Sequence, residues 1–442
     1  MEQLYIKLRW LFNRVTNKIA FYPTLLTLCG LVLGFVMLFF EDKGGTQWLY
    51  ENAQALFIND AETARSLLST FIAGIFSLMV FSFSMVMVLL SQASSNYSPR
   101  ILPGLIRSKK HQYVLGFYMG VLTYCILILL SVKPTDSQAE LPGLAILFSI
   151  ILVLNVLACF IYFIHSISEA IQINNIIEDI FQKSKTRLLT LIEKADSKDD
   201  SDFPDTSSWK VFKSEQTGYL QTIDEEGLLD LCKDKDCKID IIIAKGSFTV
   251  NNTPIARCDK ELDEKETKRL ISCFGFSRSE IVSQNYVLGF KQLTEIAVKA
   301  MSPGINDPGT ANSCLDYLNE LFALRMRKHD YSFIRDGNET KRIALRTIDF
   351  YELMYFVFSA LREYCKKDAL MMHKMLHLLH YLMMQQSVEK SYKEELIKQV
   401  NALLEDGDKF IDNSLDRASI EGLRQKIAKD NPTSQQVTPA IT

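Results

Sequence analysis

The stretch AFYPTLLTLCGLVLGFVMLFF, residues 20–40, contains no charged side chain over 21 positions. As a helix rising about 1.5 Å per residue it reaches about 31 Å, which matches the roughly 30 Å hydrocarbon core of a bilayer. Three more uncharged stretches follow before residue 168, at Ser66–Pro99, Gln112–Val132 and Leu141–Ile167. Four such stretches predict four transmembrane helices rather than the buried core of a soluble domain.

The rest of the 442-residue chain has a different composition. Most of its charge falls after residue 168, although the mean hydropathy of the whole chain is +0.05. We therefore expect a mainly α protein, with a four-span transmembrane domain over residues 1–167 and a cytoplasmic α+β domain after it. The net charge of −3 gives no reason to expect nucleic acid as a partner.

Lysine and arginine in the connections predict the orientation, because these residues favour the cytoplasmic side. They gather before the first span and between the second and third, at Lys7, Arg9, Arg14, Lys18, Arg100, Arg107, Lys109 and Lys110. The other two connections hold only Lys43, Arg65 and Lys133. Both termini are therefore expected in the cytoplasm.

The second span carries hydroxyl side chains at a regular interval. Thr70, Ser77, Ser84 and Ser91 recur every seven residues and so share one helical face. Such a face can serve close packing between membrane helices, or it can line a pore or cavity at an oligomer axis. No Asp, Glu, Lys or Arg lies in the middle of any span, which argues against a proton-relay pump.

Beyond the spans, the pattern divides into four parts. Residues 168–205 predict an amphipathic helix that continues the fourth span, followed by an acidic linker. Residues 206–258 predict a small, barrel-like β-rich module, with a hairpin that turns at Asn251-Asn252. Residues 259–430 predict a helical domain, including a helix from about Arg342 to Tyr364, and residues 431–442 predict a disordered tail.

The segment SPGINDPGTA, residues 302–311, interrupts this helical domain with two prolines and two glycines. Asp307 before Pro308 is typical of a helix N-cap and first turn. Ser302, Asn306, Asp307 and Thr310 also place four polar groups in one turn, where backbone N–H groups could bind an anion or the oxygens a hard cation. These four residues are the candidate ligand-binding site, and sequence alone does not choose between cap and ligand.

No cofactor or metal is expected. His373, His377 and His380 share a helical face, yet no HExxH motif is present, and a packed or interface face is the preferred interpretation. Cys232 and Cys237 are separated by four residues, and no second pair stands at zinc-ribbon spacing. The chain has no Walker motif, dinucleotide-binding glycine pattern or nucleophile elbow, so no enzyme and no catalytic residue is predicted.

Two blocks resemble a known family. They are ASSNYSPRILPGLIRSKKHQYVLGFYMGVLTYCILILL, residues 93–130, and GFSRSEIVSQNYVLGFKQLTEIAVKAMSPGINDPGTA, residues 275–311. They are similar to a widespread bacterial family of predicted membrane proteins, a domain of unknown function, from the first span to about residue 325. The resemblance implies a bacterial inner-membrane location and supplies no catalytic residue.

The leading functional hypothesis is a homo-oligomeric, channel-like protein in the lipid bilayer. Its second span would line a path for an ion or small solute through Thr70, Ser77, Ser84 and Ser91, and its cytoplasmic domain would assemble or gate the subunits. Arg100, Arg107, Lys109 and Lys110 would ring the inner mouth. The alternative is a membrane-anchored sensor or scaffold whose cytoplasmic domain binds a ligand or protein.

Overall fold

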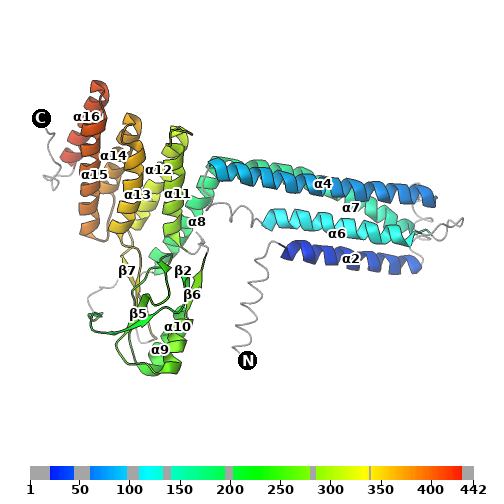
Figure 1. Ribbon diagram of the computed structural model, residues 1–442, viewed down its shortest axis with the longest axis horizontal. Helices are drawn as coiled ribbons and strands as arrows, with labels where there is room; N and C mark the ends of the chain where they lie inside the picture. The colour runs from blue at the N-terminus through cyan, green and yellow to red at the C-terminus, as the bar shows by residue number, and fades with distance from the viewer. Residues whose placement is uncertain are drawn as a thin grey trace. The chain divides into compact units, whose positions relative to one another are not determined.

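The computed structural model describes residues 20–43, 60–96, 109–132, 141–194, 203–278, 285–337 and 340–430 (Figure 1). These residues form two compact units, one that ends at Gln172 and one that begins at Ile173. Each unit has a hydrophobic core of its own.

The N-terminal unit consists of four long helices, α2 (Phe21–Asp42), α4 (Ala61–Asn96), α6 (Lys109–Ser131) and α7 (Gly143–Ile171). Each is long and apolar enough to cross a membrane, which confirms the four predicted spans. The helices run alongside one another (Figure 1), and α6 contacts the other three. Helix α4 begins at Ala61, so Arg65 lies within its first turns and not in a connection.

Helices α2 and α6 approach each other through paired glycines. Gly30 and Gly34 of α2, and Gly116 and Gly120 of α6, each form a G-x-x-x-G motif. A methyl group at Gly30 would lie 2.2 Å from the Gly120 carbonyl oxygen, and one at Gly120 would lie 2.7 Å from the Leu26 carbonyl oxygen. Small residues at this spacing let helix backbones come close in lipid. These motifs are readable from the sequence but were not among the predicted features.

Two charged side chains satisfy helix ends in this unit. Arg65 donates from Nη2 to the Val132 carbonyl oxygen at 2.7 Å, just after the last residue of α6. Glu41 accepts from the Ala145 N–H at 2.8 Å, in the first turn of α7. Unpaired groups at helix ends need such partners, and a cation suits the C-terminus while an anion suits the N-terminus.

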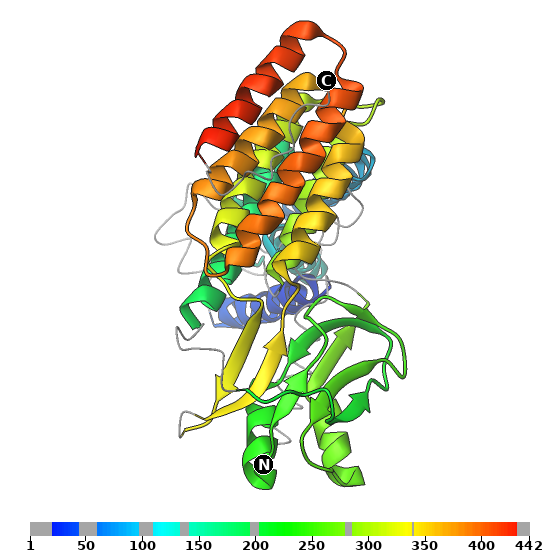
Figure 2. The ribbon, with the colours of Figure 1, turned by 90° about the vertical axis from the view of Figure 1, so that its left-hand side faces the viewer.

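The C-terminal unit contains a set of packed helices, α8 (Ile173–Lys194), α11 (Tyr286–Ala300), α12 (Pro308–Arg325), α13 (Phe350–Cys365), α14 (Ala369–Met384), α15 (Lys390–Phe410) and α16 (Ser414–Asp430). Figure 2 shows the helices from α11 onward at one end of this unit and its strands at the other. Helix α8 does not simply continue α7, because Gln172 between them is extended. Most of the expected acidic linker and all of the tail over 431–442 lie outside the described residues.

Two sheets form the β-rich part of the unit. The first has the order β1 (Lys210–Lys213), β5 (Pro254–Cys258), β3 (Ile239–Ile241), β8 (Lys341–Arg346) and β7 (Tyr331–Arg335). The second has the order β4 (Phe248–Thr249), β2 (Gly218–Ile223) and β6 (Phe274–Ser277). Helices α9 (Glu225–Lys235) and α10 (Glu264–Ser272) accompany them. The β-rich part therefore extends beyond residues 206–258 and takes three strands from the region that was predicted to be all helical.

Two local predictions were wrong. Asn251-Asn252 does form a tight turn, since Asn252 has φ 72° and the Thr253 N–H bonds the Val250 carbonyl oxygen at 3.1 Å. However, β4 pairs with β2, while β5 pairs with β1 and β3, so the turn passes the chain between sheets and makes no hairpin. The predicted helix from Arg342 begins only at Phe350, because residues 341–346 form strand β8, which pairs antiparallel with β7 and, over residues 343–345, in parallel with β3.

Candidate functional site

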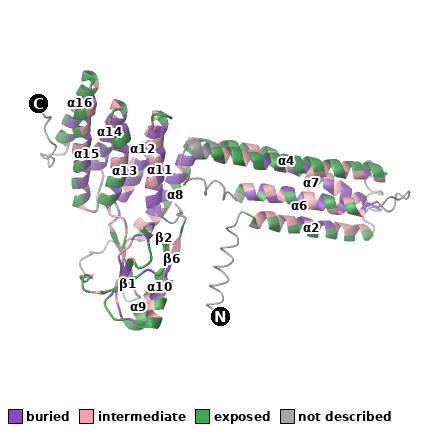
Figure 3. Cartoon of the chain, viewed as in Figure 1, coloured by how far each residue is buried: buried purple, intermediate pink, exposed green. Residues whose placement is uncertain are grey.

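The hydroxyl face of α4 points away from the other three spans. Leu68, Ile75 and Ser82 are buried against the bundle. Ser77 and Ser84 lie on the opposite side of the helix and are exposed, as are Thr70 and Ser91. Figure 3 shows α4 largely exposed along its length. Packing between spans of one chain therefore does not account for the hydroxyl stripe.

This face carries small side chains, and one of its hydroxyl groups is bonded within the helix. Thr70 donates its Oγ1 hydrogen to the Ser66 carbonyl oxygen at 2.8 Å, a bond within the helix that threonine commonly makes. A methyl group added at Gly74 would meet nothing within 4 Å. The face thus offers hydroxyl and small groups to whatever lies beside it.

The four basic residues expected at an inner mouth can be only partly located. Arg100 and Arg107 lie outside the described residues, as does the side chain of Lys109 at the start of α6. Lys110, in the first turn of α6, is exposed. The ring of bases stays a prediction.

The turn over residues 302–311 is built as a helix cap. Asp307 caps α12, accepting from the Thr310 N–H at 3.1 Å and from the Thr310 hydroxyl at 2.6 Å. These bonds hold the pKa of Asp307 below its usual value. Ser302 donates to the Lys299 carbonyl oxygen at 2.6 Å, and Asn306 takes a left-handed φ of 51°. Three of the four candidate ligand-binding residues are thus engaged in ending one helix and starting the next.

The three histidines of α14 do not act together. His380 is buried, and its Nε2 lies 3.0 Å from Asp430 Oδ2 at the end of α16. His377 is exposed and His373 is half-buried. Within the described parts of the chain the three imidazoles do not converge on one point. A packed face fits His380 alone.

A buried polar cluster, which was not predicted from the sequence, lies where α12 meets β7, α13 and α15. The Arg325 side chain is fully buried and is held by the Lys328 carbonyl oxygen at 2.6 Å, the Ile348 carbonyl oxygen at 3.1 Å and the Asp330 carboxylate. Asp330 also accepts from the Tyr392 hydroxyl at 2.9 Å. In sequence, Arg325 reads as an ordinary base in the last turn of a helix, so no local signal marks the cluster.

Lys328 gives this cluster a testable pH dependence. Its side chain is buried, and its Nζ donates to the His329 carbonyl oxygen at 2.7 Å. Burial, together with repulsion from Arg325, lowers the pKa of Lys328 to about 7 from an ordinary value of 10.5. Between pH 7 and pH 10.5, Lys328 is protonated in the unfolded chain and largely deprotonated in the folded chain, so the unfolded chain binds one more proton. The free energy of unfolding should therefore rise with pH across this window, and that gain disappears as pH falls to 7.

Urea unfolding of the C-terminal unit at pH 7, 8 and 9 would measure this effect in the intact chain. The variant Lys328→Met should show a slope smaller by about 1 kcal/mol per pH unit than the wild type. Equal slopes for the two chains would mean that Lys328 keeps its proton in the fold.

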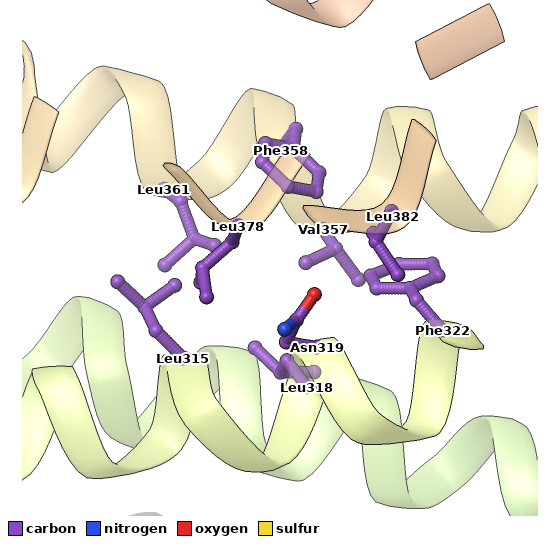
Figure 4. A pocket seen from close by; sticks show the side chains of 9 residues that line it. All are labelled: Leu315, Leu318, Asn319, Phe322, Val357, Phe358, Leu361, Leu378 and Leu382. Atoms are coloured by element: carbon purple, nitrogen blue, oxygen red, sulfur yellow. The ribbon is translucent and has the colours of Figure 1, made fainter. Parts of the chain in front are cut away.

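An apolar cavity lies between α12, α13 and α14. Figure 4 shows that Asn319 is the polar side chain among its lining residues, with Leu315 and Leu378 nearby. The cavity volume is about 10 Å³, at the lower limit for one water molecule, so it is a packing gap and not a ligand pocket.

Comparison with known proteins places the chain in a family. Residues 16–381 match the family described as predicted membrane protein, DUF2254. The chain belongs to the DUF2254 family. This match confirms the resemblance and extends it past residue 325, through most of α14.

Two mycobacterial relatives of this DUF2254 chain are described as uncharacterized proteins. They are the proteins Rv1290c of Mycobacterium tuberculosis and Mb1321c of Mycobacterium bovis, each 23% identical over 419 residues that cover 90% of this chain and 78% of the relative. No solved structure matches the chain. As a DUF2254 member with four apolar helices, the protein is a membrane protein that contacts the lipid bilayer.

Proposed function

We propose that the protein is a homo-oligomeric, channel-like assembly of the bacterial inner membrane. Helix α4 of each subunit lines a path for an ion or small solute, and the C-terminal unit assembles or gates the subunits. The observation that carries this proposal is the division of α4 into two faces: Ile75 and its heptad neighbours pack on the bundle, and Ser77 and Ser84 face outward.

The chemistry of the outward face supports a partner other than lipid. Thr70 finds an acceptor within α4, but a water-filled axis or an adjacent helix offers these hydroxyl groups further hydrogen-bond partners that lipid does not. Small side chains let copies of α4 approach one another, and hydroxyl groups suit a passive aqueous path. With no charge in the middle of the spans, the proposed pathway conducts without an intramembrane proton relay.

The orientation in this proposal follows the basic residues. Both termini lie in the cytoplasm, and Arg100, Arg107, Lys109 and Lys110 ring the inner mouth, where they favour anions. A cysteine placed after residue 430 that reacts with an impermeant reagent from outside intact cells would contradict this orientation.

Purified protein in planar bilayers provides the test. The wild type should pass current, and Ser77→Leu or Ser84→Leu should reduce it severalfold, because leucine fills the path and removes a hydroxyl group. Phe83→Leu is the matched control: Phe83 is also exposed on α4, at 57%, but lies about 100° around the helix from Ser84. It should leave the current unchanged.

Two results would contradict the proposal. One is the absence of current in every condition from a protein whose mass in detergent is that of a monomer. The other is equal current from the wild type and both serine variants. Either result favours the membrane-anchored sensor or scaffold, in which the spans only hold the C-terminal unit at the membrane.

A further inference from the structure

Three buried cysteines, Cys232, Cys237 and Cys258, lie close together in the β-rich part. The way in which helix α9 ends explains why the first two are neighbours. Helix α9 ends at a left-handed residue, Asp236, with φ 45°. The Cys237 N–H then bonds the Cys232 carbonyl oxygen at 3.0 Å, and the Asp236 N–H bonds the Lys233 carbonyl oxygen at 3.4 Å. This helix ending brings the residue after the left-handed one against the helix side chain five positions earlier. It therefore places the Cys237 side chain beside Cys232.

The third cysteine comes from a neighbouring strand. Ile239 of β3 pairs with Cys258 of β5 in antiparallel register. The pairing continues outward, where the Lys238 N–H donates to Asp259 Oδ1 at 2.8 Å and the Asp259 N–H donates to the Lys238 carbonyl oxygen at 3.2 Å. Sheet register thus brings Cys258 and Asp259 to Cys237, which a spacing rule along the sequence does not reveal.

The donor atoms are close enough to share one ion. The sulfurs of Cys237 and Cys258 and a carboxylate oxygen of Asp259 all lie within 4.8 Å of one another, with Cys258 Sγ 3.8 Å from Asp259 Oδ1. Sulfur and oxygen ligands about 2.3 and 2.1 Å from a tetrahedral zinc ion stand roughly 3.5–3.8 Å apart. Modest side-chain rotation therefore suffices to close the set.

We propose that Cys237, Cys258 and Asp259 bind a thiophilic divalent cation of the zinc type, with Cys232 beside them as the candidate fourth ligand. Two thiolates and a carboxylate suit a borderline-soft cation better than a hard one such as Mg²⁺ or Ca²⁺. Both cysteines are fully buried, while Asp259 is exposed and gives the ion a route to the site.

Binding exchanges two protons for the cation. The hydrogen bond with Cys232, together with burial, raises the pKa of Cys237 to about 12, and the bond with Cys237, together with burial, raises the pKa of Cys258. Both thiols are therefore protonated near neutral pH. Each loses its S–H proton to solvent as its sulfur bonds the cation, so affinity should increase with pH.

The consequence for the fold is local. The cation would join the end of α9 to the end of β5 in a part of the chain where only short strands hold the sheets. Metal binding of this kind adds directly to folding stability.

Cobalt binding to the full chain, purified under reducing conditions and stripped with a chelator, tests the proposal. Co²⁺ should give a thiolate charge-transfer band at one equivalent per chain, and Zn²⁺ should displace it. Cys258→Ser and Asp259→Asn should each weaken Co²⁺ binding more than about tenfold. The matched control is Cys365→Ser, which changes a fully buried cysteine of α13 outside the cluster and should leave binding unchanged.

The test remains decisive if a serine variant fails to fold. Asp259 is exposed, and an asparagine there keeps an oxygen that can accept from Lys238, so Asp259→Asn should fold. In the wild type, Zn²⁺ should protect Cys237 and Cys258 from alkylation, as mapped by mass spectrometry. A wild-type chain that shows no thiolate band, or that binds Co²⁺ as tightly after Asp259→Asn, would overturn the proposal.

Discussion

Replacing Gly30 by alanine is expected to destabilise the N-terminal unit by about 2 kcal/mol or more, at the upper part of the range for overpacked cores. The added methyl group would lie 2.2 Å from the Gly120 carbonyl oxygen, and the nearest atoms are all backbone, which no rotamer change can move. Helices α2 and α6 must therefore separate, and the packing of Gly34 and Gly116 is lost with them. Gly30→Val should have a larger effect for the same reason.

Gly74→Ala is the matched control, because the same methyl group on α4 meets nothing within 4 Å. Alanine is the better helix former, so this change should be neutral or slightly stabilising, whereas Gly30→Ala should destabilise the unit. Alkylation of Cys125, which is fully buried on α6, reports opening of the bundle as the protein is heated in micelles. Gly30→Ala should lower the temperature of half-labelling by about 4 °C or more. Equal labelling curves for the two variants would show that α2 and α6 do not meet at these glycines.

The spans could be predicted because the bilayer sets the same requirements for each helix separately. A helix in lipid must be about 20 residues long and free of charge, and both properties are visible in a single stretch such as residues 20–40. How the spans pack was also encoded locally, in the glycines of α2 and α6. The outward orientation of Ser77 and Ser84 could not be predicted. Leu68, Ile75 and Ser82 recur at the same seven-residue interval, so either face of the helix could have packed on the bundle.

The sheets were harder to predict because strand pairing is not local. The turn at Asn251-Asn252 follows from its own residues, whereas the partners of β4 and β5 depend on strands elsewhere in the chain. Residues 341–346 precede a helix, and their apolar spacing merges with it. They form a strand because they pair antiparallel with β7 and in parallel with β3, about a hundred residues earlier.

The candidate sites divide in the same way. Asp307 followed by Pro308 predicts a helix cap, and a cap is what the chain forms. The group of Cys237, Cys258 and Asp259 depends on the register of β3 and β5, and the surroundings of Arg325 depend on four separate elements. In both cases the residue types were visible in sequence and their neighbours were not.

Removing the Asp330 carboxylate should destabilise the C-terminal unit by about 3–5 kcal/mol, the range for breaking a buried ion pair on one side. In Asp330→Ala, the Arg325 guanidinium would stay fully buried without its counter-charge. The same change removes the acceptor for the Tyr392 hydroxyl and for the Phe350 N–H at the start of α13, at 2.9 and 3.1 Å. The Arg325 side chain has 0% exposure and that of Asp330 has 23%, so the guanidinium loses its counter-charge at a site largely closed to water.

Amide hydrogen exchange in the intact chain measures this loss, since a change of 3 kcal/mol speeds exchange from the unfolded unit by about a hundredfold. Amides in α12 and α13 should show the increase. Asp316→Ala is the matched control: Asp316 is on α12 too, and it pairs with Lys374 at 2.6 Å, but its side chain is 59% exposed. This change should lower the free energy of unfolding by less than about 1 kcal/mol, because an exposed ion pair contributes little to stability. If the two variants exchange alike, Arg325 has access to water in the folded chain, and the cluster around it contributes no more than a surface ion pair.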